Sequence, residues 1–196
     1  MTLSALGIFS AAGAGGAPTS GFELIQTEII SGSSTSSVTF SNLGNFSSTY
    51  RHLQIRAACL FSATDSTISV RINGDSGNNY AHHTLFGNGS SVNSNAFTSG
   101  NVMMIHYNQD NNSTNEPGVV VSDFLDVYST TKNKTVRSFG GTSSGTFKNQ
   151  VRLNSGVWMN TASVTSISVS HGISFTGWAN ANFRAGTRIS LYGIRG

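Results

Sequence analysis

Short stretches in which apolar and polar residues alternate, each closed by turn-forming residues, constrain the fold of this chain most strongly. In TISVRIN (67–73), Ile68, Val70 and Ile72 occupy every second position, with polar residues between them. Successive side chains of a strand point to opposite faces, so this spacing predicts a strand with one buried face. The stretch GDSGNN follows directly and predicts a turn.

The same pattern continues to the end of the chain and predicts about ten to twelve strands, with no convincing helix after residue 20. The expected strands are 22–30, 38–43, 52–61, 67–73, 80–86, 101–107, 118–128, 135–141, 150–159, 163–170 and 188–194. Regular strands without helices predict an all-β, two-sheet β-sandwich. The strand number and the length of 196 residues favour a jelly roll. The immunoglobulin sandwich is the alternative, although it needs fewer strands and usually has a Cys pair.

The composition agrees with a folded β protein that has many polar loops. Only 10% of the residues are charged, whereas disordered chains are usually highly charged and poor in aromatic residues. The length suits one sandwich domain over residues 21–196, preceded by an arm over residues 1–20. The single cysteine, Cys59, lies in the apolar stretch QIRAACLF, which predicts a buried thiol and folding in a reducing cytoplasm.

The first 18 residues, MTLSALGIFSAAGAGGAP, carry no charged side chain. They lack the basic n-region of a signal peptide and are too short for a transmembrane helix, so no membrane insertion is expected. The apolar residues Leu3, Leu6, Ile8 and Phe9 predict a docking arm that is buried in a partner or in a bundle of its own copies. A frayed terminus is the alternative interpretation.

The charge pattern gives little sign of a nucleic-acid partner. The net charge is +3, but Lys and Arg are scattered along the chain rather than gathered in one stretch. Nucleic-acid binding requires a concentrated basic face. We therefore expect no nucleic acid among the partners.

The polar motifs predict no catalytic centre, no cofactor and no metal site. His82 and His83 are neighbours on a strand, so they point to opposite faces and cannot bind one metal ion together. The loop around Asp75 lacks the acidic residues of a calcium loop and predicts Asx turns. Asp123 and Asp126 are expected on opposite faces of one strand, unlike the paired carboxylates of a glycosidase.

Aromatic and amide side chains offer the only hint of recognition, through stacking on and hydrogen bonding to a sugar. Trp158 is expected in the core, whereas Trp178 lies in the predicted loop FTGWANANF. The candidate residues for binding a host surface polysaccharide are Trp178, Asn180, Asn182, Tyr107, Asn111 and Asn112.

Three stretches together resemble a family of small all-β structural proteins of tailed bacteriophages, common in marine phages. The stretches are STYRHLQIRA, RINGDSGNNYAHHTLFGNGSS, and the run from GVWMNTASVTSISV through NFRAGTRISLYGIRG. The resemblance spans about residues 22–196, and the motifs specify structure rather than catalysis.

The resemblance implies a non-enzymatic virion protein that is assembled in the bacterial cytoplasm. The first expectation is a surface appendage of the tail, fibre or spike type, a homotrimer whose arm docks on portal, tail or capsid subunits. A capsid decoration protein that stabilises the shell is the alternative. A free lectin-like carbohydrate-binding module is a second alternative, and loops on a rigid sandwich would then carry the recognition.

Overall fold

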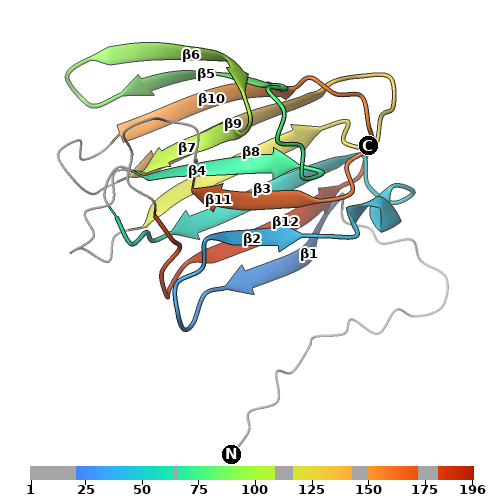
Figure 1. The fold of residues 1–196 in the computed structure, drawn as a ribbon, viewed down its shortest axis with the longest axis horizontal. Helices are drawn as coiled ribbons and strands as arrows, with labels where there is room; N and C mark the ends of the chain where they lie inside the picture. Colours follow the sequence, from blue (N-terminus) through green and yellow to red (C-terminus); the bar gives the residue numbers. More distant parts are fainter. Residues whose placement is uncertain (1–20, 64–65, 109–116, 143–149, 172–180) are drawn as a thin grey trace, which may run out of the picture.

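The computed structural model describes residues 21–63, 66–108, 117–142, 150–171 and 181–196. These residues form an all-β fold of two antiparallel sheets, as the alternating pattern predicted. The eight-stranded sheet has the order β1-β12-β3-β8-β9-β10-β5-β6, and the four-stranded sheet has the order β2-β11-β4-β7. Figure 1 shows the small sheet lying against one face of the large sheet.

The strands of the large sheet have the following bounds: β1 Phe22–Ile29, β12 Arg188–Ile194, β3 His52–Cys59, β8 Gly118–Leu125, β9 Lys134–Thr142, β10 Gln150–Trp158, β5 Tyr80–Gly87 and β6 Val92–Gly100. Those of the small sheet are β2 Ser37–Phe40, β11 Ile167–His171, β4 Ser66–Ile72 and β7 Met103–Asn108.

Eight of these strands have the order of a jelly roll. The large sheet contains β1-β12-β3-β8, and the small sheet contains β2-β11-β4-β7 in the same sequence of neighbours. Each strand of the first set is therefore followed or preceded along the chain by its counterpart in the second set. This is the wrapped, double Greek-key arrangement of a jelly roll.

Four further strands widen the large sheet beyond β8. The pair β5 and β6 is inserted between β4 and β7, and the pair β9 and β10 is inserted between β8 and β11. Together they add β9-β10-β5-β6 to one edge of the sheet, and we call these four strands the extension. In Figure 1, β5 and β6 lie at the far edge, beyond β7 of the small sheet.

The core lies between the two sheets. Its largest fully buried apolar side chains come from both sheets and from the loops that join them. They are Trp158, Tyr80, Phe40, Phe61, Phe124, Phe183, Leu43, Leu53, Ile55, Ile68 and Ile72. The thiol of Cys59 is fully buried, which confirms the prediction of a packed thiol. Trp158 is a core residue, also as predicted.

Several predicted boundaries are wrong, each for a local reason. The strand expected at 118–128 ends at Leu125 because Asp126 has a φ of 47°, in the left-handed region that a strand does not adopt. The strands expected at 38–43 and 163–170 are shorter, and residues Leu43–Phe46 form a 3₁₀ helix where none was expected. Strand β6 was not predicted because VNSNAFTSG has no apolar alternation.

The two ends of the sandwich lie side by side. The backbone N–H of Arg195 donates to the carbonyl of Gly21 at 3.0 Å, next to the pairing of Phe22 with Ile194. The predicted docking arm, residues 1–20, lies outside the described residues. Within the described part of the chain, no helix is long and apolar enough to span a membrane.

Candidate functional site

An exposed apolar surface covers the outer face of the large sheet, on the side away from the small sheet. We call it the outer apolar face. Its members are Leu85, Val119, Val121, Phe139, Val151 and Leu153. Their exposed fractions run from 40% for Val121 to 57% for Phe139. Exposed apolar side chains that gather in one place mark interaction sites more often than scattered ones do.

The strand register places these side chains in two adjacent rows. Val121 of β8 pairs with Phe139 of β9, which pairs with Leu153 of β10, and the row continues to Leu85 of β5. The members of such a row are directly opposite one another on neighbouring strands, so their side chains are in reach of each other. The row is therefore continuous across four strands.

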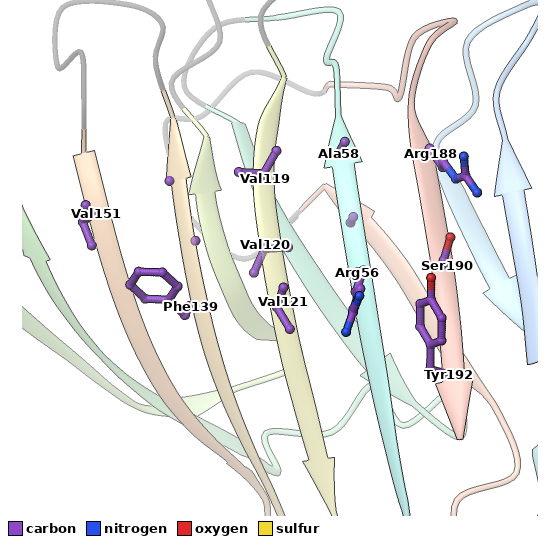
Figure 2. A pocket seen from close by; sticks show the side chains of 13 residues that line it. Arg56, Ala58, Val119, Val120, Val121, Phe139, Val151, Arg188, Ser190 and Tyr192 are labelled. Carbon is purple, nitrogen blue, oxygen red and sulfur yellow. The ribbon is translucent and has the colours of Figure 1, made fainter. Parts of the chain in front are cut away.

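The second row contains a glycine between two valines. Gly141 pairs with Val119 on one side and with Val151 on the other. Because position 141 has no side chain, the sheet is hollowed there. The result is a groove of about 600 Å³ on the outer face. Figure 2 shows the labelled side chains that line it, which are Arg56, Ala58, Val119, Val120, Val121, Phe139, Val151, Arg188, Ser190 and Tyr192.

One rim of the groove is aromatic and cationic. The guanidinium of Arg56 lies 4.8 Å from the ring centroid of Phe22 and 5.0 Å from that of Tyr192, and the two rings stack at 4.7 Å. Arg188 also lines the groove, and none of the described residues that line it is acidic. The groove therefore combines an apolar floor with a positive rim.

One part of the extension has its polarity reversed relative to an ordinary sandwich sheet, although Val136, Trp158 and Tyr80 of the same strands face the core. The row next to Val121, Phe139, Leu153 and Leu85 points inward and is entirely polar. Its members are Ser122, Ser138, Asn154 and Thr84, all buried. A sheet that packs on a core normally buries its apolar row and exposes its polar one. Here the apolar row faces away from the core.

Specific contacts of β10 explain why its polar residues face inward. Asn154 donates through Nδ2 to the carbonyl of Ile105 at 2.8 Å. The buried guanidinium of Arg152 donates to Oε1 of Gln150 and lies between the rings of Phe86 and Tyr107, at 4.2 and 4.7 Å from their centroids. Burial lowers the pKa of Arg152 to about 10, so the group remains charged at neutral pH.

The sequence indicates this reversal for β8 but not for β10. In GVVVSDFL of β8, valines occupy consecutive positions 119–121, and apolar residues on both faces indicate a strand that has two apolar surfaces. In QVRLNSGVW of β10, the alternation suggests that Val151 and Leu153 are buried. The structure places them outward, because Arg152 and Asn154 have partners inside.

A second, smaller hollow surrounds Asp126 at the end of β8. Asp126 accepts from Arg51 Nε at 2.6 Å and from Lys132 Nζ at 3.2 Å, and these hydrogen bonds and charges lower the pKa of its carboxyl. Asp123 instead pairs with Arg137 on β9, at 3.1 Å. Asp126 is thus neutralised by two cations and Asp123 by another, and Asp123 does not line the hollow around Asp126.

The loop that contains Asp75 is organised by hydrogen bonds within the protein. The Asp75 carboxylate accepts from Trp158 Nε1 at 2.7 Å, from Asn79 Nδ2 at 2.9 Å and from the backbone N–H of Gly77 at 2.9 Å. The bond to Gly77 is the predicted Asx turn. These bonds, led by that of Trp158, lower the pKa of Asp75.

The histidines of β5 lie as the sequence predicted. His82 is buried and stacks on Phe97 at 4.8 Å, whereas His83 is exposed on the opposite face. In the part of the chain that the structure describes, no group of three or more His, Cys, Asp and Glu side chains is placed to hold a metal ion.

Only two of the predicted recognition residues lie in the described part of the chain. Tyr107 is the second-last residue of β7, and one face of its ring is against Arg152. Asn182 is exposed beside Phe183, and its backbone N–H donates to Ser62 Oγ. The positions outside the described residues are Trp178, Asn180, Asn111 and Asn112, together with the arm residues Leu3, Leu6, Ile8 and Phe9. The sugar-binding prediction therefore stays untested.

Comparisons with protein-family models and with curated proteins find no match to this chain. The arrangement of its own residues is thus the basis for a functional proposal. The outer apolar face has no acid, histidine or cysteine among the residues that line its groove. What this surface can do chemically is bury apolar groups of another protein segment.

Proposed function

We propose that this chain is a non-enzymatic structural protein of a bacteriophage virion, a surface appendage of the tail, fibre or spike type that is carried by its N-terminal arm. The outer apolar face is the observation that carries the proposal. An apolar row that faces water over four strands is unfavourable in free energy. Burial of this row under another protein is favourable. A protein that works inside an assembly has such a cover.

The places of the family-like motifs in the structure support a structural role. STYRHLQIRA supplies Leu53 and Ile55 to the core through β3. The GDSGNNY stretch supplies Asp75, which holds Trp158. In the final motif, Gly193 of β12 lies against the ring of Tyr50, where a Cβ would clash. The motifs therefore account for the folding of the sandwich.

A decoration protein on the capsid is a second candidate, favoured by the breadth of the outer apolar face. A surface that extends across β8, β9, β10 and β5 suits contact with a protein shell. The appendage and the decoration protein differ in copy number, because a shell repeats its subunits many more times than a tail does.

The first experiment is quantitative mass spectrometry of purified particles of the phage that encodes the chain, with the major capsid protein as reference. A surface appendage with closed symmetry predicts on the order of ten copies per particle. Hundreds of copies would establish the decoration protein instead. Absence of the chain from the particles would overturn both proposals.

A variant of the N-terminal arm tests whether the arm anchors the protein on the particle. In the first variant, Leu3, Leu6, Ile8 and Phe9 are all replaced by Ser. We expect this protein to fold, since the buried core of the described residues lies after residue 37, and to be lost from the particles. The control variant replaces Ser4 and Ser10 by Ala, which keeps the apolar side chains. Equal incorporation of the two variants would contradict an anchoring role for the arm.

A further inference from the structure

We infer that the outer apolar face is the binding site for the N-terminal arm of a second copy of this chain. The inference deepens the proposed function, because it names the partner of the arm. It rests on the part of that proposal in which residues 1–20 are a docking element. Copies would then be joined by exchange of arms, each arm lying on the sheet of its neighbour.

The groove is suited to an uncharged apolar segment. Its floor is formed by Val119, Val121, Phe139 and Val151, and Gly141 leaves room between Val119 and Val151. A charged side chain placed on this floor would lose hydration without gaining a partner there. Residues 1–20 contain no charged side chain and include four large apolar ones between positions 3 and 9.

The rim argues against direct docking of two outer apolar faces. Arg56 and Arg188 border the groove, and in the described part of the chain no acid lines it. If two copies met face to face about a twofold axis that runs across the strands, their cationic rims would be brought together, and like charges across an interface cost affinity. An arm without charges lies on the same surface without this repulsion.

The direction of β1 favours a neighbour's groove over the chain's own. Phe22 begins β1 opposite Ile194, whereas Thr27 and Ile29, near its end, pair with the groove residues Ser190 and Arg188. The backbone thus enters the sheet two residues beyond Tyr192, at the rim that Phe22 and Tyr192 form, rather than over the valine floor. A line that continues β1 backward from Phe22 leads away from that floor.

The segment between the apolar arm residues and the sheet is long enough for this exchange. Phe9 and Phe22 are separated by 13 residue steps, which span up to about 43 Å when extended. Within one sheet, β9 lies four strands from β1, or about 19 Å at the usual strand spacing. The segment therefore spans more than this distance, which is enough to reach β9 of a copy that lies beside β1.

Photo-crosslinking of the full-length chain tests the inference. The photoreactive amino acid p-benzoylphenylalanine replaces Phe139 in unlabelled protein, which is mixed with ¹⁵N-labelled wild-type protein. After irradiation, mass spectrometry locates the crosslinked peptide. We expect crosslinks from position 139 to residues 1–20 that carry the ¹⁵N label. The same photoreactive residue at Thr39, exposed on the small sheet, is the control and should give none.

Three results would overturn the inference. Crosslinks to unlabelled residues 1–20 of the same molecule, with no labelled product, would make the arm a latch on its own sheet. Crosslinks to residues 119–153 of the labelled copy would make the surface a face-to-face interface. Absence of any crosslink to this chain would assign the surface to a different protein.

Charge substitution gives an independent readout. Phe139→Lys places a cation on the floor of the groove, and the matched control Thr135→Lys places one on the same face of β9 outside it. By analytical ultracentrifugation, we expect Phe139→Lys to weaken self-association at least about tenfold, which corresponds to about 1.4 kcal/mol. Equal self-association of the two variants would contradict the inference.

These measurements use the purified chain alone, so their failure is distinct from a failure of the proposed function. If the chain is present in particles but position 139 never crosslinks to an arm, the virion role is supported and the arm exchange is wrong. If the chain exchanges arms but is absent from particles, the arm exchange is supported and the virion role is wrong.

Discussion

At the scale of single residues, the Asp75 carboxylate links the loop after β4 to the end of β10. It accepts hydrogen bonds from the Trp158 indole, the Asn79 amide and the Gly77 backbone. Tyr80, also in this region, donates from its hydroxyl to the carbonyls of Ile72 and Asp75. One carboxylate thus fixes the position of the largest buried side chain of the core.

We predict that Asp75→Ala lowers the free energy of unfolding by about 2 kcal/mol, because the Trp158 N–H loses its acceptor. Asp75→Asn keeps one acceptor oxygen and should cost about 1 kcal/mol. Urea denaturation at neutral pH measures both. Glu28→Gln is the control, since the Glu28 carboxylate accepts an exposed hydrogen bond from Gln26. Equal effects of Asp75→Ala and Glu28→Gln would contradict the role of Asp75.

The two buried histidines make stability depend on pH. Burial and the nearby charge of Arg152 lower the pKa of His106 to about 3, and burial with the charge of His83 lowers that of His82 to about 4. Since the unfolded chain takes up these protons near pH 6.5, the stability that these residues give is complete above pH 6.5. It is lost as the pH falls toward 4 and 3.

We therefore expect the free energy of unfolding to fall between pH 6.5 and 4, and His106→Gln to reduce this fall. Denaturation with urea at half-unit pH steps measures the profile. His83→Gln, which removes an exposed imidazole, controls for the loss of one histidine. A wild-type profile that is flat above pH 4 would contradict the buried, neutral state of both side chains.

At the scale of elements, β7 and β9 approach each other closely at Gly140. A Cβ built on Gly140 would lie 2.6 Å from both the Val119 carbonyl oxygen and His106 Nδ1. The His106 ring of β7 thus occupies the volume that a side chain of β9 would fill. The close approach is what lets the small sheet cover the first strand of the extension.

We predict that Gly140→Ala lowers the free energy of unfolding by about 1–3 kcal/mol, since overpacking forces backbone shifts. Gly32→Ala is the matched control, because a Cβ built on Gly32 would have no neighbouring atom within 4 Å. Thermal and urea unfolding of both variants test the prediction. Equal stability of Gly140→Ala and the wild type would mean that β7 can move away from β9 at no cost.

The strand β6 is the least protected element of the large sheet. It lies at the sheet edge, pairs only with β5 and is exposed on both faces from Val92 to Ser99. We predict that its amide hydrogens exchange fastest among the described strands, because local opening there exposes little apolar surface. Hydrogen-exchange mass spectrometry measures this. Protection of β6 equal to that of β3 would indicate that another surface covers the strand.

At the scale of the whole molecule, the pairing of β1 with β12 closes the sandwich. The first strand and the last strand of the chain are neighbours, and Gly21 contacts Arg195 through a backbone hydrogen bond. Most pairings in the large sheet likewise join segments far apart in sequence. The wrapped topology therefore brings the two ends of the fold together.

A circular permutant tests this closure. A short glycine linker joins Gly196 to Gly21, and the chain is opened between Gly89 and Ser90, in the turn between β5 and β6. Because the linked ends are already adjacent, we expect a cooperative urea transition with the same m-value as the wild type. The permutant omits residues 1–20, so failure to fold would contradict the view that the arm serves docking rather than folding.

The sequence by itself determined the class of the fold. Alternation such as that of Ile68, Val70 and Ile72 is a local property, and these three side chains are buried in β4, in the centre of the small sheet. Thr67 before them and Ser69 between them are buried as well, which the alternation did not predict. The Asx turn at Asp75 and the opposite directions of His82 and His83 are also local properties. Each depends only on neighbours along the chain.

Only the tertiary structure decided which face of the extension is buried. The alternation of Val151 and Leu153 shows that one face of β10 is apolar, but not which side the core is on. That choice depends on Arg152 and Asn154, whose partners Tyr107 and Ile105 come from β7, a distant segment of the chain. Long-range partners outweighed local hydrophobicity there, and the apolar row was left on the outside.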